Sequence, residues 1–294
     1  MSKTCAVVVT YNRLPLLKET IEALINVGEG LDKVFVINNA STDNTHEFLS
    51  KLTKDNALIE EYLMEENLGG SGGFYMGIKH AYDKGYDYIW IMDDDSIVTP
   101  DSLLPLKTAF KEVENVGFCC SKVVWTDGDA HKMNIPEVSR MNDNKISFFA
   151  DPGYVNVNSC SFVSVLIHRD IVKEVGYPYK DFFIWFDDVE YTKRIIKKGY
   201  KGLFSEKSIV IHKTLTNYAV DLYNCEKKDF WKMKYGIRNR TFMLKKHKDY
   251  AMLLLYTLRS FYRALTRKNN KLEAFSIAVV QVIKGLRFNP KNES

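Results

Sequence analysis

Three adjacent carboxylates follow an apolar segment in the first third of the chain. Residues 93–95 are all Asp, and they come directly after Ile89-Trp90-Ile91-Met92. Charges this close repel one another, so they can be buried at a strand end only with a counter-charge. Mg²⁺ or Mn²⁺ suits this role, because both bind carboxylate and phosphate oxygens. In an extended segment Asp93 and Asp95 point to the same side. The alternative is a solvated acidic turn.

A second acidic group, Asp187, Asp188 and Glu190, follows an aromatic run at residues 182–186. Aromatic neighbours exclude water from a carboxylate and raise its pKa, which prepares it to accept a proton as a general base. The structural alternative is a buried strand that leads into a helix, with Asp187 or Asp188 as the cap and Glu190 in the first turn. The two interpretations are compatible.

A glycine-rich segment and one histidine complete the candidate residues. Residues 67–74 read Asn-Leu-Gly-Gly-Ser-Gly-Gly-Phe, so the backbone there can approach a nucleotide or a sugar closely. The segment matches neither the dinucleotide-binding fingerprint nor the P-loop, and a flexible turn is the alternative. His212 follows the apolar run at residues 209–211. A lone histidine is more often structural, unless residues 93–95 lie beside it.

The elements that must position these residues alternate between buried-strand and helix patterns. The strand-like apolar runs are residues 6–9, 34–37, 58–63 and 88–92. The segments with helical spacing are residues 15–27, 48–52 and 77–84. This alternation predicts an α/β fold with a mostly parallel sheet and helices on both faces. Ligands gather at the carboxyl ends of such strands, which is where each polar cluster falls.

Composition and length indicate a globular protein. The chain has 294 residues, of which 46% are hydrophobic and 27% charged. Residues 120–215 show only short strands and loops, with 155–167 as the clearest apolar stretch. The five cysteines form no C-x-x-C pair, and the apolar run at residues 5–9 is too short for the core of a signal peptide. We therefore expect a reduced, cytosolic protein.

Charge is divided unevenly along the chain. Residues 1–225 hold 24 Lys and Arg against 32 Asp and Glu, a net of −8, whereas residues 226–294 hold 17 against 5, a net of +12. A basic tail of this kind indicates an anionic partner, either phospholipid or nucleic acid. No helix-turn-helix, zinc-finger or RNA-binding signature supports nucleic acid. Apolar helical patterns at residues 250–258 and 273–286 favour an anionic membrane surface instead.

The helical patterns in residues 226–294 have two further interpretations. They could form a structural cap on the first region, residues 1–225, or an oligomer interface. No apolar run reaches the roughly 18 residues that a membrane span requires. If the protein meets a membrane, we expect it to lie on the surface.

The order of six motifs resembles family 2 inverting glycosyltransferases of the GT-A fold. The resemblance covers about residues 4–215. It implies a GT-A catalytic domain at residues 1–215, followed by a basic helical region at residues 216–294. The glycine segment, the Asp-Asp-x-Glu box and the downstream His look most like bacterial galactofuranosyltransferases, and rhamnosyltransferases of the same family are similar. The motifs are residues 8–13, 38–43, 67–74, 93–95, 187–190 and His212.

The resemblance implies a role for each matching residue. Asp93, Asp95 and His212 would bind Mn²⁺ or Mg²⁺ on the donor diphosphate. Asp188 would be the catalytic base, with Asp187 and Glu190 beside it. Asn38 stands where the family commonly has Asp, but it can still accept a hydrogen bond from a uracil N–H. The implied donor-binding residues are Thr10, Tyr11, Arg13, Asn38, Asn67, Gly69, Gly70, Gly72, Gly73 and Asp94.

The resulting expectation is a metal-dependent inverting glycosyltransferase on the inner face of the cell membrane. It would move galactofuranose from UDP-galactofuranose to a lipid-linked glycan acceptor, in the synthesis of a surface polysaccharide such as capsule or O-antigen. The alternatives are a rhamnosyltransferase that uses dTDP-rhamnose and a catalytically silent, membrane-attached nucleotide-sugar binder. An Asp-x-Asp phosphatase fits less well, because it needs Thr or Val where Ile97 stands.

Overall fold

The computed structural model describes residues 2–139, 149–150, 153–219, 221 and 223–291. Its described strands form one sheet in the order β3-β2-β1-β4-β10-β6-β11-β9-β7, with β5 paired to β11 and β8 paired to β9. The strands are β1 (Thr4–Thr10), β2 (Lys33–Asn38), β3 (Ile59–Leu63), β4 (Tyr88–Asp93), β5 (Ser96–Val98), β6 (Val116–Val124), β7 (Glu137–Val138), β8 (Phe149–Ala150), β9 (Tyr154–Ser159), β10 (Val165–His168) and β11 (Lys201–His212). The helices are α1 (Leu14–Ile25), α2 (Thr45–Asp55), α3 (Gly69–Asp83), α4 (Leu103–Glu112), α5 (Arg169–Val175), α6 (Asp187–Lys197), α7 (Phe230–Lys246), α8 (Tyr250–Leu265) and α9 (Lys271–Arg287).

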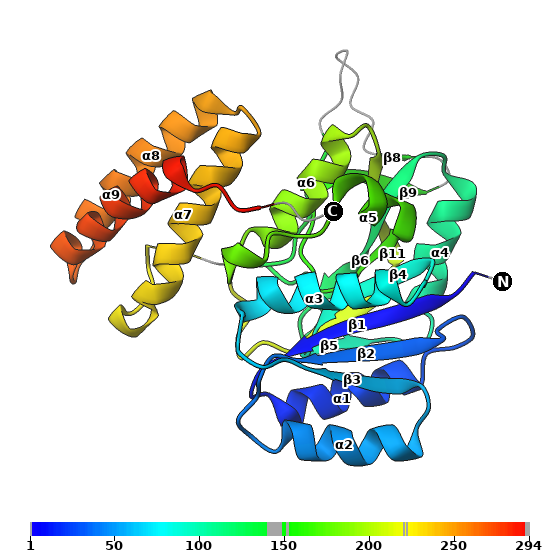
Figure 1. Cartoon of the computed structure of the whole chain (residues 1–294). Helices are drawn as coiled ribbons and strands as arrows, with labels where there is room; N and C mark the ends of the chain where they lie inside the picture. The colour runs from blue at the N-terminus through cyan, green and yellow to red at the C-terminus, as the bar shows by residue number, and fades with distance from the viewer. Residues whose placement is uncertain (1, 140–148, 151–152, 220, 222, 292–294) are drawn as a thin grey trace.

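Strands β1 to β4 form the parallel half of the sheet. β2 and β4 flank β1, and β3 pairs with β2, all in parallel. β1 is buried along its whole length, because α1 and α2 cover one face of the sheet and α3 covers the other (Figure 1). A strand buried on both faces is apolar at successive positions, and this explains why the sequence pattern identified these strands. The predicted α/β class is confirmed.

The second half of the sheet is mixed. β10 runs antiparallel to β4 and β6, while β11 is parallel to β6 and antiparallel to β9 and β5. The apolar stretch at residues 155–167 is divided between β9 and β10. The pairing of β5 with β11 sets His212 opposite Ser96, and so brings the end of β11 to the acidic residues that follow β4.

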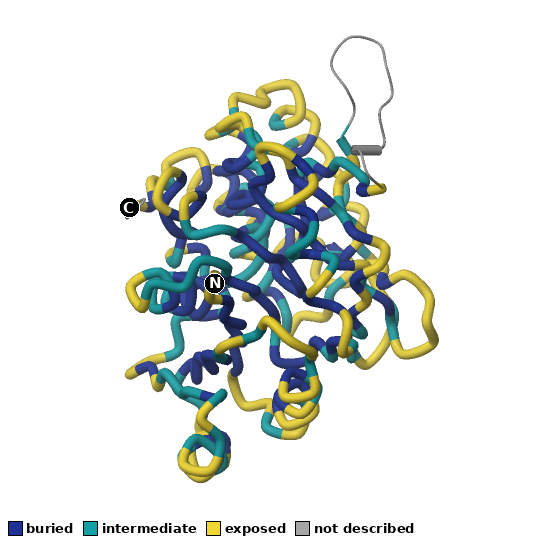
Figure 2. Tube along the Cα trace, turned by 90° about the vertical axis from the view of Figure 1, so that its right-hand side faces the viewer, coloured by how far each residue is buried: buried dark blue, intermediate teal, exposed yellow. Residues whose placement is uncertain are grey.

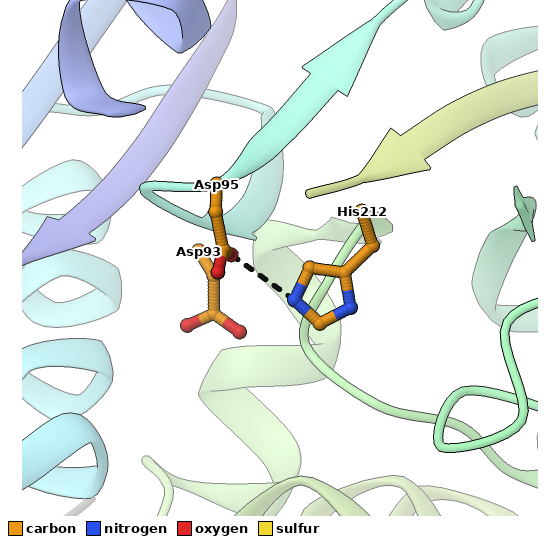
Figure 3. A group of neighbouring side chains, drawn as sticks. All are labelled: Asp93, Asp95 and His212. Carbon is orange, nitrogen blue, oxygen red and sulfur yellow. Dashed lines mark ion pairs between the residues drawn. The ribbon is translucent and has the colours of Figure 1, made fainter. Parts of the chain in front are cut away.

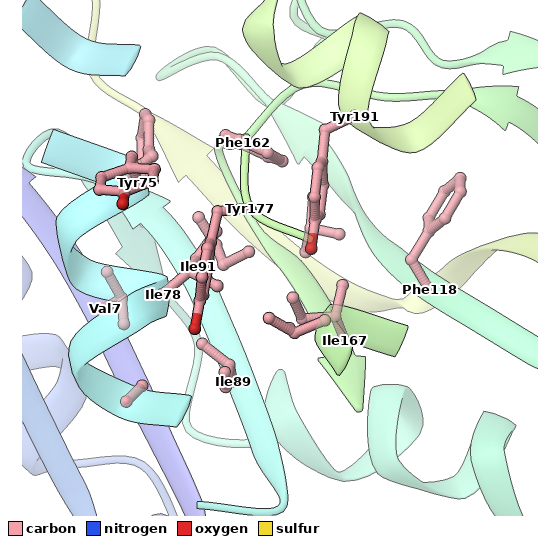
Figure 4. Close-up of a cluster of buried hydrophobic side chains, with 14 of the residues drawn as sticks. Val7, Tyr75, Ile78, Ile89, Ile91, Phe118, Phe162, Ile167, Tyr177 and Tyr191 are labelled. Carbon is pink, nitrogen blue, oxygen red and sulfur yellow. The ribbon is translucent and has the colours of Figure 1, made fainter. Parts of the chain in front are cut away.

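One apolar cluster connects the two helices that carry the candidate site. It joins Val7 and Ile91 of the sheet to Tyr75 and Ile78 of α3 and to Tyr191 of α6 (Figure 4). All five residues are buried. The starts of α3 and α6 are therefore fixed relative to one another by the same core.

Two local predictions are wrong. Helix α3 begins at Gly69, so most of the predicted glycine loop is the first turns of a helix. The aromatic run at residues 182–186 is not a strand: a 3₁₀ turn, Lys180–Phe182, is followed by Phe183, Trp185 and Phe186 with positive φ. Phe186 is the N-cap of α6, and no side chain caps the helix. The predicted Asp cap is thus absent.

Helices α7, α8 and α9 form a group beside the sheet (Figure 1). Their shared core includes Phe230, Met233 and Ile277, and Trp185 and Phe186 from the first region pack against it. The helical group therefore contacts the segment that precedes α6. In the part of the chain that the structure describes, no helix combines the length and the apolar character that crossing a bilayer requires.

Helix α8 has one apolar face turned to solvent. Its buried residues are Tyr256, Ser260 and Ala264. At about 100° per residue, the opposite face carries a row of large apolar side chains, each between 46% and 68% exposed. Figure 2 shows how exposed and buried segments are distributed over the chain. We call the row the α8 apolar row; its members are Leu254, Leu255, Leu258, Tyr262 and Leu265.

Candidate active site

The end of β4 and the end of β11 bring three metal-ligand side chains together. One ligand atom each from Asp93, Asp95 and His212 lies within 4.8 Å of the others (Figure 3). His212 Nε2 is 3.0 Å from Asp95 Oδ1, yet that buried oxygen has no hydrogen bond of acceptable geometry. Two carboxylates and an imidazole with an unsatisfied buried oxygen fit a divalent cation.

The electrostatics of the acidic residues agree with that fit. Burial and the charges of Asp95 and Asp94 raise the pKa of Asp93 well above its usual range. Burial would raise the pKa of Asp95 as well, but His212 and Arg13 beside it hold the pKa below its ordinary value. A bound cation would keep Asp93 ionised. The cation would be the counter-charge that the three adjacent carboxylates require.

Arg13 is the protein's own partial counter-charge. Its Nη1 lies 2.6 Å from Asp95 Oδ2 and 3.2 Å from Asp94 Oδ1. Asp94 Oδ2 accepts a hydrogen bond of 2.7 Å from Thr10 Oγ1, and the Asp94 carbonyl accepts one of 2.7 Å from Thr20. Asp94 and Thr10 therefore fix the turn after β4, whereas half-exposed Arg13 reaches the cavity beyond it.

His212 is oriented by residues that the sequence analysis did not identify. Asn134 Oδ1 lies 2.7 Å from His212 Nδ1, so a proton on Nδ1 leaves Nε2 free to bind a cation. The His131 ring lies 4.5 Å from the His212 ring, and burial and the charge of His212 lower the pKa of His131 to about 4. Both residues lie in the irregular stretch after β6, where no periodic pattern marks them.

One cavity of about 460 Å³ joins the two acidic groups. The cation-binding group, Asp187 and Asp188 all line it. Among the other lining residues are Gly70, Phe162 and Trp185, together with Tyr218 and Lys232 from the chain after β11. A cavity of this size accommodates a ligand of nucleotide-sugar dimensions.

Asp187 and Asp188 lie at the start of α6 with raised pKa values. Burial, and then the charge of Asp188, raises the pKa of Asp187 to about 7. Burial raises the pKa of Asp188 to about 6. The Val189 N–H acts in the opposite direction, because it donates a hydrogen bond of 2.6 Å to Asp188 Oδ1. Both carboxylates therefore have pKa values raised toward the range in which a general base works at neutral pH.

Glu190 does not lie among the cavity-lining residues. Its buried carboxylate is 2.7 Å from Arg194 Nη2, and Arg194 also donates to the carbonyls of Val175 and Tyr177. This ion pair fixes α6 to the end of α5. The geometry therefore supports a structural role for Glu190 rather than contact with an acceptor.

The glycines of α3 serve packing more than ligand contact. A Cβ on Gly69 would lie 2.0 Å from the Phe183 carbonyl oxygen, and one on Gly73 would lie 2.4 Å from a Val9 methyl. A Cβ on Gly72 would meet Leu68. Only around Gly70 is there open space, and among the four it alone lines the cavity. Gly70 is thus the glycine with room for a ligand beside it, and the roles of Gly69, Gly72 and Gly73 in donor binding stay predictions.

Two asparagines at the end of β2 organise the approach to α3. Asn39, which belongs to the motif at residues 38–43 but has no predicted role of its own, donates to Asn67 Oδ1 and to the Gly69 carbonyl and accepts from Leu68 N. Buried Asn38 accepts from Ser41 N and donates to Glu61 Oε1. Neither Asn38, Asn67 nor exposed Tyr11 lines the cavity. Their roles in donor binding remain predictions.

Comparison with known proteins agrees with this geometry. The family model "Glycosyl transferase family 2" matches residues 5–176. The galactofuranosyltransferase GlfT1 of Mycolicibacterium smegmatis is 28% identical over 207 residues, which are 66% of this chain and 66% of that enzyme. The chain thus spans just under two thirds of the length of this relative.

Two solved structures have a similar fold. The first is GalNAc-T7 with UDP, GalNAc and Mn²⁺, which has a TM-score of 0.65 and 14% identity and covers 95% of this chain and 55% of its own. The second is the mannosyltransferase PcManGT of Pyrobaculum calidifontis with GDP-Man and Mn²⁺. It has a TM-score of 0.57 and 15% identity, and the match covers 98% of this chain and 76% of that one. At this identity they show the fold alone. With the family model covering more than half of its residues, the chain belongs to glycosyl transferase family 2 and has the GT-A fold.

Proposed function

We propose that this enzyme is a metal-dependent inverting glycosyltransferase that moves a sugar from a nucleoside diphosphate to an acceptor hydroxyl. The observation that best supports the proposal is that one cavity joins the group Asp93, Asp95 and His212, which could hold a cation, to the carboxylate pair Asp187 and Asp188. Transfer with inversion needs one base for the acceptor proton and stabilisation of the leaving diphosphate, but no covalent nucleophile.

In this mechanism Asp188 accepts the proton of the acceptor hydroxyl. The raised pKa of about 6 leaves it ionised at neutral pH, yet basic enough to take the proton as the sugar bond forms. Asp187, with a pKa of about 7, carries a proton for much of the time and so limits repulsion within the pair.

Asp93, Asp95 and His212 would hold Mn²⁺ or Mg²⁺. When bound, the cation offsets the negative charge that develops on the departing diphosphate. Arg13 lines the same part of the cavity, and its guanidinium would contribute a second positive charge beside the phosphates. Gly70, at the open start of α3, leaves room for the donor.

The finer donor and acceptor assignment rests on similarity. The similarity to the galactofuranosyltransferase GlfT1 supports galactofuranose as the transferred sugar, and the motif resemblance implies UDP-galactofuranose as its donor. The α8 apolar row and the net charge of +12 in residues 226–294 support attachment to an anionic membrane surface. A lipid-linked glycan at the inner face of the cell membrane is the acceptor that such an attachment would serve, in the synthesis of a surface polysaccharide.

Release of diphosphate from a panel of nucleotide sugars tests the reaction and the donor. With Mn²⁺ or Mg²⁺ and a lipid-linked glycan acceptor, we expect UDP release from UDP-galactofuranose and none in the presence of chelator. Turnover of dTDP-rhamnose instead would assign the donor differently while leaving the reaction class intact. Nucleotide binding without turnover of any donor would contradict the catalytic proposal.

A further inference from the structure

The segment that leads into the catalytic helix has an unusual backbone. Phe183, Trp185 and Phe186 have φ values of 66°, 67° and 69°, although bulky residues rarely adopt a positive φ. Such a conformation persists only where the surrounding structure holds it. Asp187 and Asp188 follow immediately, so whatever holds residues 182–186 also sets the position of the proposed base.

One buried side chain from the C-terminal helices contacts this segment at three carbonyls. Asn239 of α7 is fully buried. Its Nδ2 donates to the carbonyl oxygens of Phe182, Ile184 and Trp185 at 3.0, 3.0 and 2.9 Å. The Asn239 Oδ1 atom accepts from Arg238 Nε at 2.9 Å, so the amide uses both of its ends.

The remaining carbonyls of the segment are paired within the catalytic domain. The Phe183 oxygen accepts from Ser71 N at the start of α3, and the Phe186 oxygen accepts from Glu190 N within α6. Every carbonyl from 182 to 186 therefore has a donor. Asn239 serves three of them, and the Phe182 oxygen also accepts from Ile184 N at 2.8 Å and from Arg238 Nη2 at 3.2 Å. An amide nitrogen suits this position because it can donate to the three carbonyl oxygens. A carboxylate of the same size would place an acceptor oxygen beside them instead of a donor.

We propose that Asn239 is a positioning residue for sugar transfer. By holding residues 182–186 from the side of α7, it aims Asp188 at the cavity and makes the C-terminal helices a working part of the active site. The catalytic part of this inference rests on the proposed role of Asp188, whereas the restraint on the segment does not.

The test compares Asn239→Asp with a control variant of equal stability. The control is Ile277→Ala or Ile277→Val, whichever loses as much Tm as Asn239→Asp does. Ile277 lies in the core of the same helical group, against which Trp185 and Phe186 pack, so its variants weaken apolar support while they keep the amide of Asn239. Hydrogen exchange of peptides covering residues 182–188 reports the restraint without any substrate. Steady-state kinetics with the donor and acceptor identified in the panel report catalysis.

For Asn239→Asp we expect exchange in residues 182–188 to accelerate at least tenfold, while the matched Ile277 variant exchanges as the wild type does. We expect kcat to fall about 10²-fold, because a displacement of about 1 Å costs this much. The donor KM should stay within about threefold, since Asp93, Asp95 and His212, which would hold the cation on the donor, lie at the ends of β4 and β11. If Asn239→Asp does not fold, Asn239→Ser replaces it, because a hydroxyl still donates one bond.

Equal exchange and equal kcat in the Asn239 and Ile277 variants at matched Tm would overturn the inference. Asp188→Asn, measured in the same assay, separates this inference from the proposed function. If Asp188→Asn keeps full activity, the base is misassigned, and accelerated exchange in Asn239→Asp would then support only the restraint. If Asp188→Asn is inactive while Asn239→Asp turns over normally, the positioning role fails and the base assignment stands.

Discussion

Asp93 and Asp95 differ from the other carboxylates of the cavity in having His212 beside them. Alanine at either position removes one of two carboxylate ligands. We therefore expect Asp93→Ala and Asp95→Ala to lose transfer activity and to lose the part of donor binding that depends on Mn²⁺, measured by titration calorimetry with UDP. Metal-independent activity that survives in either variant would contradict the cation site.

Asp188 gives the pH dependence of kcat a predicted sign. Its pKa is raised to about 6 in the folded enzyme, and the base works only when ionised. We expect kcat, at saturating donor and metal, to fall as the pH decreases through about 6. Asp188→Asn keeps the size of the side chain but cannot accept the proton, so kcat should fall by about 10² or more and lose this acidic limb.

Asp187→Asn is the matched comparison, because it changes the neighbouring carboxylate of the same turn. It should retain activity and leave the pH at which kcat declines unchanged, since burial and not the charge of Asp187 raises the pKa of Asp188. If Asp187→Asn is the inactive variant and Asp188→Asn turns over, the two roles are reversed.

The candidate metal ligands and base could be predicted from the sequence. The residues that orient them could not. Asp93, Asp95 and His212 each end a recognisable apolar run, and parallel or paired strand ends meet at one edge of a sheet. Asn134 and His131 lie in a stretch without periodicity, so only the folded chain shows that they orient His212. Asn239 is an interior residue of a helix in another part of the chain, and no local pattern connects it with Asp188.

At the scale of elements, the junction between α3 and the segment before α6 has a sharp steric requirement. Gly69 has a φ of +72°, and its Cβ position is 2.0 Å from a backbone oxygen, so Gly69→Ala should strain the backbone and displace the segment. We expect a loss of about 1–3 kcal/mol in the free energy of unfolding, measured by denaturant titration, with a loss of kcat.

Gly70→Ala is the control for this prediction. Its Cβ would meet nothing within 4 Å, and Ala is favoured over Gly in a helix by about 1 kcal/mol. The variant should be as stable as the wild type or more so, with a raised donor KM because Gly70 lines the cavity. Equal stability losses in both variants would mean that the contact with Phe183 does not decide the junction.

The elements themselves were predictable where the pattern was simple. β1, β2 and β4 are buried on both faces and appear as continuous apolar runs. The start of α3 was missed because glycine is a poor helix former, and here close packing on Val9 and Phe183 overrides that preference. The aromatic run at 182–186 has the composition of a strand, but its backbone conformation is set by contacts from α3 and α7 that lie far away in sequence.

At the scale of the whole molecule, the α8 apolar row and the basic charge predict salt-sensitive attachment to membranes. Removal of the C-terminal helices is a poor test, because they also hold the segment before α6. We expect a triple variant of Leu254, Leu258 and Tyr262 to Ser to sediment less with anionic vesicles than the wild type while it keeps its folded Tm. Added salt should weaken binding further, since surface attraction is worth about 1 kcal/mol per basic residue.

A matched triple Ser variant of the exposed apolar residues Leu63, Leu104 and Ile135 in the first region controls for a general loss of apolar surface. It should bind vesicles as the wild type does. Equal sedimentation of the two variants, or a concentration-dependent dimer that the α8 variant abolishes, would identify the row as an oligomer contact instead.

The cavity is lined by residues that run from Arg13 to Lys232, and α7 reaches the segment before Asp187 from still later in the chain. During synthesis, β1 to β4 and their helices leave the ribosome first and contain most of their own strand pairs, so they have the means to fold early. β10, which pairs with β4 and β6, and β11, which pairs with β6, are made later. Asn239 follows both of them. A nascent chain can thus possess the acidic triplet long before it possesses a placed base, and it acquires the ability to transfer a sugar only when almost all of it has been made.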